Sequence, residues 1–147
     1  MHQASAMRAR RIEALLARVE SRWPAAQQRL IQTFLKHYHG AVSTRDLNER
    51  DTQNLYGAAL SHWALAQTRT AGRARVQAYN PDPEQNGWES THTVVQIVTD
   101  DQPFLVDSVS MALNELGLII HLIVHPVLQV ARDDHAMIQS VGAEPSE

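Results

Sequence analysis

The chain has 147 residues, of which 44% are hydrophobic and 20% charged, as in a soluble globular protein with one domain or a small domain plus an appendage. No apolar run reaches the roughly 18 residues of a membrane-spanning helix, and the amino terminus lacks the apolar core of a signal peptide. The absence of cysteine excludes disulfides and thiolate metal sites, so we expect a cytoplasmic protein without a membrane partner.

The charge is distributed unevenly along the chain. Residues 1–50 contain nine basic and four acidic residues, whereas residues 51–147 contain four basic and twelve acidic residues. A basic half can indicate nucleic-acid binding. Here the arginines fall between apolar positions at helical spacing, which is typical of a solvated helix face. We therefore expect no nucleic-acid partner.

The first part of the chain has helical periodicity. Apolar residues recur at three- and four-residue spacing in residues 8–22, 24–39 and 52–68. Three such amphipathic helices can bury a common core. The sequence therefore predicts a helical segment over residues 1–72.

Several polar residues mark positions within this helical segment. Ser43, three residues before Asp46, is typical of a cap on a short helical turn. Asp51 can cap the last long helix, and Pro24 suits a break after the first. His62 lies beside an apolar stripe, where a packed, hydrogen-bonded histidine is more common than a ligand.

After residue 72 the period changes from helical to alternating. Residues 73–79 read as a half-buried strand with Val76 on the apolar side, and residues 80–87 read as a loop with two prolines and an Asn-Gly pair. Residues 88–99 read as a second strand, apolar enough to be covered on both faces.

The stretch from residue 99 to residue 126 reads as the end of a strand, a helix and another strand, a βαβ unit with short connections. Pro103 suits the first helical position and Gly117 ends the helical pattern. Residues 118–130 alternate as a strand that bends or lies at an edge at Pro126.

A turn at residues 132–134 and a return strand at residues 136–141 complete a hairpin. The resulting sheet lacks a covering helix. We therefore expect an α/β sandwich over residues 73–147 that is truncated at its carboxyl end or completed by a partner chain.

Two histidines in the last long strand invite a test for metal binding. His121 and His125 are four residues apart, which on a strand separates their Cα atoms by about 13 Å. No ligand between them is supplied locally, so we expect no metal site. Together with Ile123, they mark one sheet face as a candidate interface with another module or subunit.

Motifs for catalysis are missing from the sequence. Ser108 lies inside a helical pattern and no G-x-S-x-G turn surrounds it. The six glycines are scattered without a G-x-G, so a dinucleotide-binding fold of the usual kind is not expected. We assign no catalytic residue.

The acidic turn before the predicted helix is the best candidate binding site. It consists of Asp100, Asp101, Gln102, Pro103 and Phe104. Free N–H groups at a helix start can bind a carboxylate, and Asp100 or Asp101 could meet an amino group, as in a pocket for an amino acid. The alternative is that these aspartates only cap the helix.

Three segments, residues 54–63, 79–117 and 118–128, resemble the amino-terminal region of the large bacterial NAD-specific glutamate dehydrogenases. The resemblance covers roughly residues 45–135. It implies that the chain is a fragment of a long polypeptide with ACT-like regulatory modules ahead of the dehydrogenase domain. The βαβ stretch over residues 88–132 is similar to the opening half of an ACT fold, whose order is βαββαβ. The implied fold is α+β, with three helices followed by an incomplete, ferredoxin-like, mainly antiparallel sheet.

The same resemblance implies a function. ACT modules generally bind small ligands, often amino acids, at a D-x-P-G type turn; here Phe104 replaces the glycine that permits close approach of a ligand. Lys36 is the only lysine, so no catalytic residue is carried over and NAD belongs to the parent enzyme. We expect a non-catalytic regulatory or assembly module whose partners are the remaining domains and other subunits of a homo-oligomer. An amino-acid sensor and a pure oligomerisation element are the alternatives.

Overall fold

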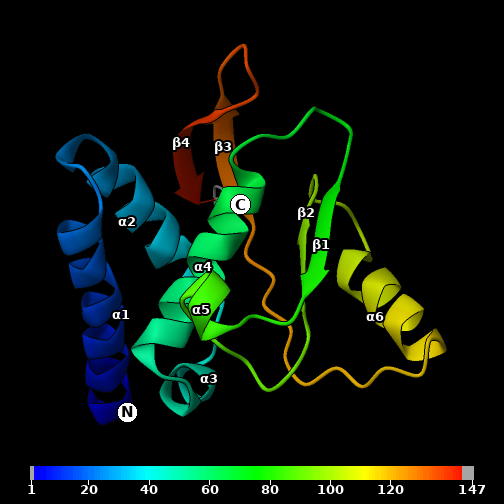
Figure 1. Ribbon diagram of the computed structural model, residues 1–147, viewed down its shortest axis with the longest axis horizontal. Helices are drawn as coiled ribbons and strands as arrows, with labels where there is room; N and C mark the ends of the chain where they lie inside the picture. Colours follow the sequence, from blue (N-terminus) through cyan, green and yellow to red (C-terminus); the bar gives the residue numbers. More distant parts are fainter. Residues whose placement is uncertain (1, 144–147) are drawn as a thin grey trace.

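A computed structural model describes residues 2–143 and shows an α+β fold with helices and strands in separate layers (Figure 1). None of the helices in this range is long and apolar enough to cross a membrane. The elements in chain order are α1 (His2–Arg22), α2 (Ala25–Gly40), α3 (Thr44–Glu49), α4 (Thr52–Ala66), β1 (Arg75–Tyr79), α5 (Pro83–Asn86), β2 (Val94–Val98), α6 (Leu105–Glu115), β3 (Leu128–Arg132) and β4 (Ile138–Ala143).

The helices α1, α2 and α4 pack together and form the main core, as the apolar periodicity predicts. The predicted break at Pro24 separates α1 from α2, because proline and the residue before it disfavour a continuous helix. The core residues share near-complete burial and come from all three helices: Leu15, Val19, Ile31, Phe34, Leu35, Leu55, Ala59 and Trp63.

Both predicted helix caps are confirmed. The Asp46 backbone N–H donates to the Ser43 hydroxyl at 3.1 Å, at the start of α3. The Asn54 N–H donates to a carboxylate oxygen of Asp51 at 2.8 Å, at the start of α4. Each cap satisfies a backbone donor that the first turn leaves without a partner.

Two arginines of α1 do more than cover a solvated face. The Arg8 guanidinium donates to the carbonyl oxygens of His39 and Val42, both at 2.8 Å, and Arg11 donates to the carbonyl of Leu47 at 2.8 Å. His39 and Leu47 lie in the last turns of α2 and α3, and Val42 follows α2. Carbonyl oxygens at a helix end carry partial negative charge. The two cations therefore join α1 to the ends of its neighbours.

The antiparallel β1–β2 pair presents its polar side to α4, which reverses the expected burial of β1. Gln77 lies opposite Gln96 in the register, and both side chains face Ser61 of α4. Val76, expected to be buried, is 61% exposed. The hydrogen bonds to Ser61 of α4 therefore determine which face of β1 is covered. The second strand is shorter than the predicted residues 88–99, since β2 begins at Val94.

The expected βαβ unit is not formed as one sheet. Residues 118–127 form no strand, and only Leu128–Arg132 forms one, β3. β3 pairs with β4 and does not lie beside β2 in a common sheet. A hairpin closes a much shorter loop than a crossover and so costs less chain entropy. Gly117 ends the helical pattern as predicted, at φ 77°, but α6 begins at Leu105 rather than at Pro103.

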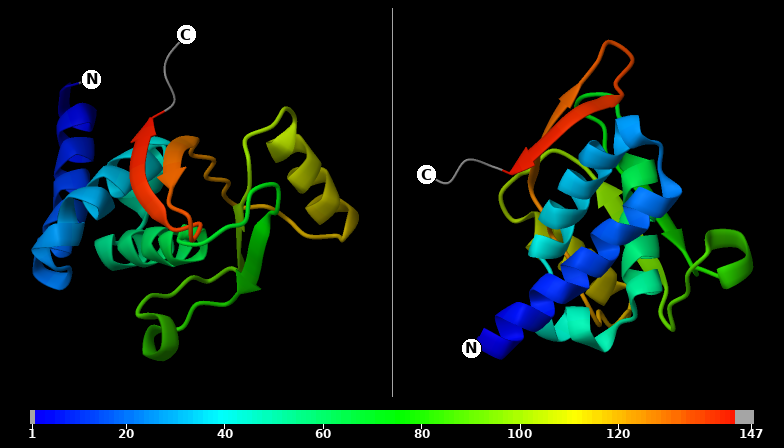
Figure 2. Two further views of the ribbon diagram at one scale, coloured as in Figure 1. Left: turned by 90° about the horizontal axis from the view of Figure 1, so that it is seen from above. Right: turned by 90° about the vertical axis from the view of Figure 1, so that its left-hand side faces the viewer.

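The β3–β4 hairpin packs against the helical body. Ile138 is buried in the core cluster, and Arg132 donates to the carbonyl of Gln67 near the end of α4 at 3.2 Å. The pictures show three layers: the helical body, the β1–β2 sheet, and α6 on the far side of that sheet (Figures 1 and 2). The division of the chain at residue 72 stays a prediction.

Candidate functional site

The acidic turn that links β2 to α6 is held by an ion pair. A carboxylate oxygen of Asp100 lies 2.5 Å from the guanidinium of Arg69, which is mostly buried beyond the end of α4. Arg69 also donates to the carbonyl of Arg73 at 2.9 Å. Asp100 thus fastens the turn to the helical body, while the exposed Asp101 lies beside it.

Phe104 has a backbone conformation that normally belongs to glycine. It is the N-cap of α6 at φ 62° and ψ 19°, and its side chain is 77% exposed. This is the position where the sequence comparison above expects glycine in a D-x-P-G turn. Phe104 thus holds a left-handed backbone with a benzyl group attached, at a cost of about 1–2 kcal/mol for a side-chain-bearing residue.

No side-chain hydrogen bond caps the start of α6, whose N-cap is Phe104. The alternative that the aspartates only favour the positive start of this helix stays a prediction. Asp100 pairs with Arg69, and Gln102 and Pro103 are exposed. The first turn of α6 has backbone N–H groups that could donate to the carboxylate of an amino acid. Asp101 lies next to them and could pair with its ammonium group. The prediction of an amino-acid site at residues 100–104 stays a prediction.

The three candidate interface residues lie on the extended stretch between α6 and β3 rather than on a paired strand. His121 stacks on His92, with ring centroids 3.9 Å apart and planes 12° apart. Ile123 and His125 are exposed. Their role as an interface stays a prediction. Within residues 2–143 no three His, Asp or Glu side chains gather as a possible metal site.

A cleft of about 1470 Å³ separates the helical body from β2, α6 and the extended stretch. Its lining includes Tyr38, His62 and Trp63 from the helical body, Ile97 from β2 and Leu113 from α6. Its lining is mixed, because charged residues such as Asp51, Arg69 and Asp100 lie beside these apolar and aromatic side chains, and it includes the whole of β2.

His62 connects three elements across this cleft. Its Nδ1 lies 3.1 Å from the Tyr38 hydroxyl on α2, and its Nε2 lies 3.0 Å from the carbonyl of Ile97 on β2. A neutral ring that carries its proton on Nε2 satisfies both contacts. Burial lowers the pKa of His62 and raises that of Tyr38, which favours these neutral forms. The prediction of a packed, hydrogen-bonded histidine is confirmed.

A polar network joins α4 to both strands of the first sheet. The Ser61 hydroxyl lies 2.5 Å from that of Tyr79 and 3.1 Å from the side-chain oxygen of Gln96. Gln96 is buried and donates to the carbonyl of Ala58 at 3.1 Å. These residues position β1 and β2 on α4, and the alternating pattern alone did not reveal them.

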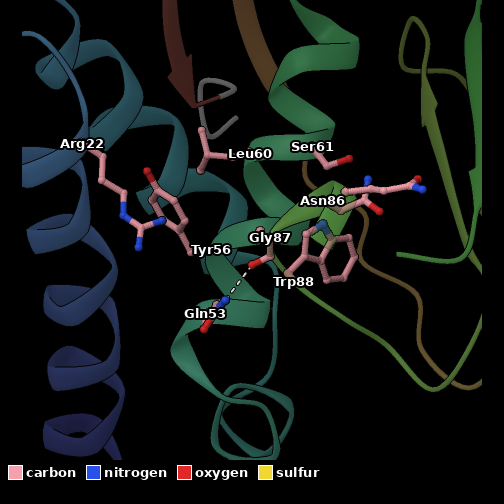
Figure 3. Close-up of a pocket in the computed structure, with 10 residues that line it drawn as sticks. Arg22, Gln53, Tyr56, Leu60, Ser61, Asn86, Gly87 and Trp88 are labelled. Atoms are coloured by element: carbon pink, nitrogen blue, oxygen red, sulfur yellow. Dashed lines mark hydrogen bonds between the residues drawn. The ribbon is translucent and has the colours of Figure 1, made fainter. Parts of the chain in front are cut away.

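A smaller pocket of about 360 Å³ opens between the end of α1, α4 and the loop after α5 (Figure 3). The Arg22 guanidinium lies over the Tyr56 ring, 5.4 Å from its centroid, and Gln53 donates to the carbonyl of Gly87 at 2.7 Å. Trp88, which the sequence places at the start of a strand, is instead buried against Gly57. This packing fixes the loop on α4.

The α+β architecture, with two small antiparallel sheets after a helical region, is consistent with an ACT-like domain. Residues 34–147 match the family described as "Glutamate dehydrogenase, ACT1 domain", and the chain belongs to this family.

Two relatives are named NAD-specific glutamate dehydrogenase. The protein of Halomonas elongata is 40% identical over 136 residues, which are 92% of this chain and 8% of the relative. The protein of Pseudomonas aeruginosa is 37% identical over 117 residues, which are 80% of this chain and 7% of the relative. The chain thus spans less than a tenth of the length of these relatives, and no solved structure matches it. The resemblance to the amino-terminal region of this family is confirmed.

Proposed function

We propose that this chain is a non-catalytic regulatory or assembly module of an NAD-dependent glutamate dehydrogenase. The observation that carries the proposal is the match of residues 34–147 to the ACT1 domain of that family, together with the names of the two relatives. The whole enzyme would convert L-glutamate, NAD and water to 2-oxoglutarate, ammonium and NADH in the cytoplasm. Its remaining domains and other subunits would be the partners of this module.

NAD is assigned to the parent enzyme rather than to this chain. A Rossmann-type dinucleotide site needs a parallel strand–helix–strand unit whose first turn lets the pyrophosphate approach the backbone through glycines. Here both sheets are antiparallel pairs, and the turn into α6 carries Phe104 instead of glycine. The only lysine, Lys36, is exposed on α2. We therefore assign NAD binding and catalysis to the rest of the parent polypeptide.

Two measurements test this proposal. The purified chain, incubated with L-glutamate and NAD, should produce no NADH absorbance under conditions in which the parent enzyme does. Turnover by the 147 residues alone would overturn the non-catalytic role. In the parent enzyme, the Asp100→Asn change, which removes the ion pair with Arg69, should alter effector response or subunit assembly while the dehydrogenase chemistry persists.

An amino-acid sensor is the second candidate, and the uncapped first turn of α6 beside Asp101 favours it. Calorimetric titration with the common amino acids tests it directly. Binding should weaken in the Asp101→Asn variant, whereas Asp134→Asn, a matched change in an exposed turn, should leave it unchanged. Absence of heat together with an unchanged melting temperature would reject the sensor role.

A further inference from the structure

The chain exposes more surface than a compact monomer of its mass. Its accessible area is 9866 Å² at 16.5 kDa. The scaling of folded monomers gives about 7,500 Å² for this mass, so roughly 2,300 Å² is in excess. A stable interface needs about 800 Å² from each partner. The excess is therefore large enough for a specific protein–protein contact.

Much of the exposed apolar surface belongs to one part of the chain, residues 104–127, which we call the apolar arm. It consists of α6, its left-handed cap and the extended stretch that leads to β3, and Figure 2 shows α6 apart from the helical body. No side chain of α6 is buried. Of eleven large hydrophobic side chains exposed in the described chain, seven lie on the arm: Phe104, Met111, Leu116, Leu118, Ile119, Leu122 and Ile123.

The extended stretch of the arm has an unused backbone. Within the described chain, residues 119–127 make no backbone hydrogen bond to another segment, although their alternation is that of a strand. A row of unpaired N–H and C=O groups beside apolar side chains is a template for pairing with another strand. Residues 116–131 also contain no Asp, Glu, Lys or Arg.

We propose that the apolar arm binds the same arm of a second copy of this chain. In a twofold arrangement each extended stretch, residues 118–124, pairs antiparallel with its counterpart, so one surface serves both partners. Because the stretch carries no formal charge, two copies meet without the like-charge repulsion that opposes most self-pairing strands. The exposed Met111 and Leu116 lie on the adjoining helix and extend the contact.

The inference rests on the proposed assembly role and specifies its partner. The proposed function and this inference can be refuted independently. Turnover by the chain would refute the non-catalytic role, whereas the mass of the chain in solution tests the interface. Closure of the arm onto its own chain, or binding of the arm only to later parts of the parent polypeptide, would leave the chain monomeric and would overturn the inference.

Sedimentation equilibrium of the 147-residue chain across a wide dilution series tests the inference. We expect a reversible dimer. Ile119→Lys and Ile123→Lys should each weaken it on the order of a hundredfold, because a lysine would be buried without a partner. Met7→Lys is the matched control, since Met7 on α1 and Ile123 are both 48% exposed. It should dimerise as the wild type does.

Circular dichroism should show the same helix content in all three variants. A wild-type monomer at high concentration, or equal dimerisation of the Ile119→Lys and wild-type chains, would overturn the inference. So would a loss of dimerisation in Met7→Lys as large as that in Ile123→Lys.

The absence of native cysteine permits a second, geometric test. Single cysteines are introduced at successive positions along residues 118–124 and oxidised. In an antiparallel twofold pair only the positions next to the axis bring two identical residues within the 4.4–6.8 Å Cα separation that a disulfide needs, about one or two of the seven. Strong cross-linking at every position, or at none, would contradict the proposed pairing.

Discussion

Gly57 offers a test of the packing that fixes the loop before β2 on α4. It lies in the interior of α4, and a Cβ added there would lie closer than 3.0 Å to Cβ and Cγ of Trp88. Trp88 is only 4% exposed, so moving its ring would break buried contacts. We predict that Gly57→Ala destabilises the chain, against the usual effect of this change in a helix.

Two opposing terms set the magnitude. Replacing glycine by alanine in a helix interior stabilises by about 0.8–1.0 kcal/mol through propensity. The overlap involves the root of the Trp88 side chain, so a rotamer change cannot remove it and the loop itself must shift. Overpacking costs about 1–3 kcal/mol, and displacement of a buried tryptophan up to about 3–5 kcal/mol. The expected net loss is about 1–3 kcal/mol of unfolding free energy.

Urea unfolding followed by far-ultraviolet circular dichroism measures this loss. Gly40→Ala is the control, because Gly40 ends α2 with no atom within 4 Å of an added Cβ. It should be neutral or slightly stabilising. In a Trp88→Ala background, Gly57→Ala should lose most of its cost, since the overlapping atoms are gone. Wild-type or higher stability of the single Gly57→Ala variant would refute the close packing.

Three further predictions concern single residues. Arg8→Ala should lower the free energy of unfolding in urea by about 1.5–3 kcal/mol, because it removes charged hydrogen bonds at the end of α2. The exposed Arg10→Ala is the control and should change it by no more than about 0.5 kcal/mol. Equal effects of the two changes would contradict this prediction. Phe104→Gly should raise the melting temperature, because glycine removes the strain of a left-handed backbone, about 1 kcal/mol, and the lost ring is exposed. A lower melting temperature than that of the wild type would argue against this strain. Burial lowers the pKa of His39 and His62. The unfolded chain therefore takes up protons first as the pH falls below about 6.5, so the urea midpoint should fall from about pH 7.5 to about pH 5.5, and a flat profile would contradict the shift.

The parts of the fold that depend on local chemistry were predictable from the sequence. Ser43 and Asp51 cap helices with their own side chains, and Gly117 ends a helical pattern because it adopts positive φ without strain. The apolar stripes of the long helices likewise identify their core faces. In each case the determining atoms lie within a few residues of one another, so the sequence contains the whole cause.

Contacts between distant residues could not be predicted in this way. Trp88 packs on Gly57 and Arg8 reaches the end of α2, and in both pairs neither partner's local pattern identifies the other. The face of β1 was misassigned because Val76 is more apolar than Gln77, whereas the hydrogen bonds to Ser61 and Gln96 place Gln77 against α4. Polar complementarity between elements outweighed side-chain hydropathy there.

The candidate site was predictable to the same degree. The sequence identified the turn at residues 100–104 and the substitution of phenylalanine for glycine, but not the pairing of Asp100 with Arg69, a residue 31 positions earlier. A single sequence shows that an aspartate could cap a helix or meet a ligand. Only the fold shows that Arg69, just after α4, lies next to Asp100 and pairs with it.

The extended stretch after α6 shows why an alternating pattern is insufficient to predict a strand. Alternation specifies which side chains share a face, but a strand exists only when its backbone finds a neighbour. In residues 118–127 the pattern is present and the neighbour is missing, because β3 pairs with β4 and the described chain supplies nothing to the preceding residues. Residues with strand periodicity, no formal charge and exposed isoleucines at positions 119 and 123 are expected to pair wherever a matching edge is available. A second copy supplies such an edge at the same residues, which connects the missing strand to the proposed interface.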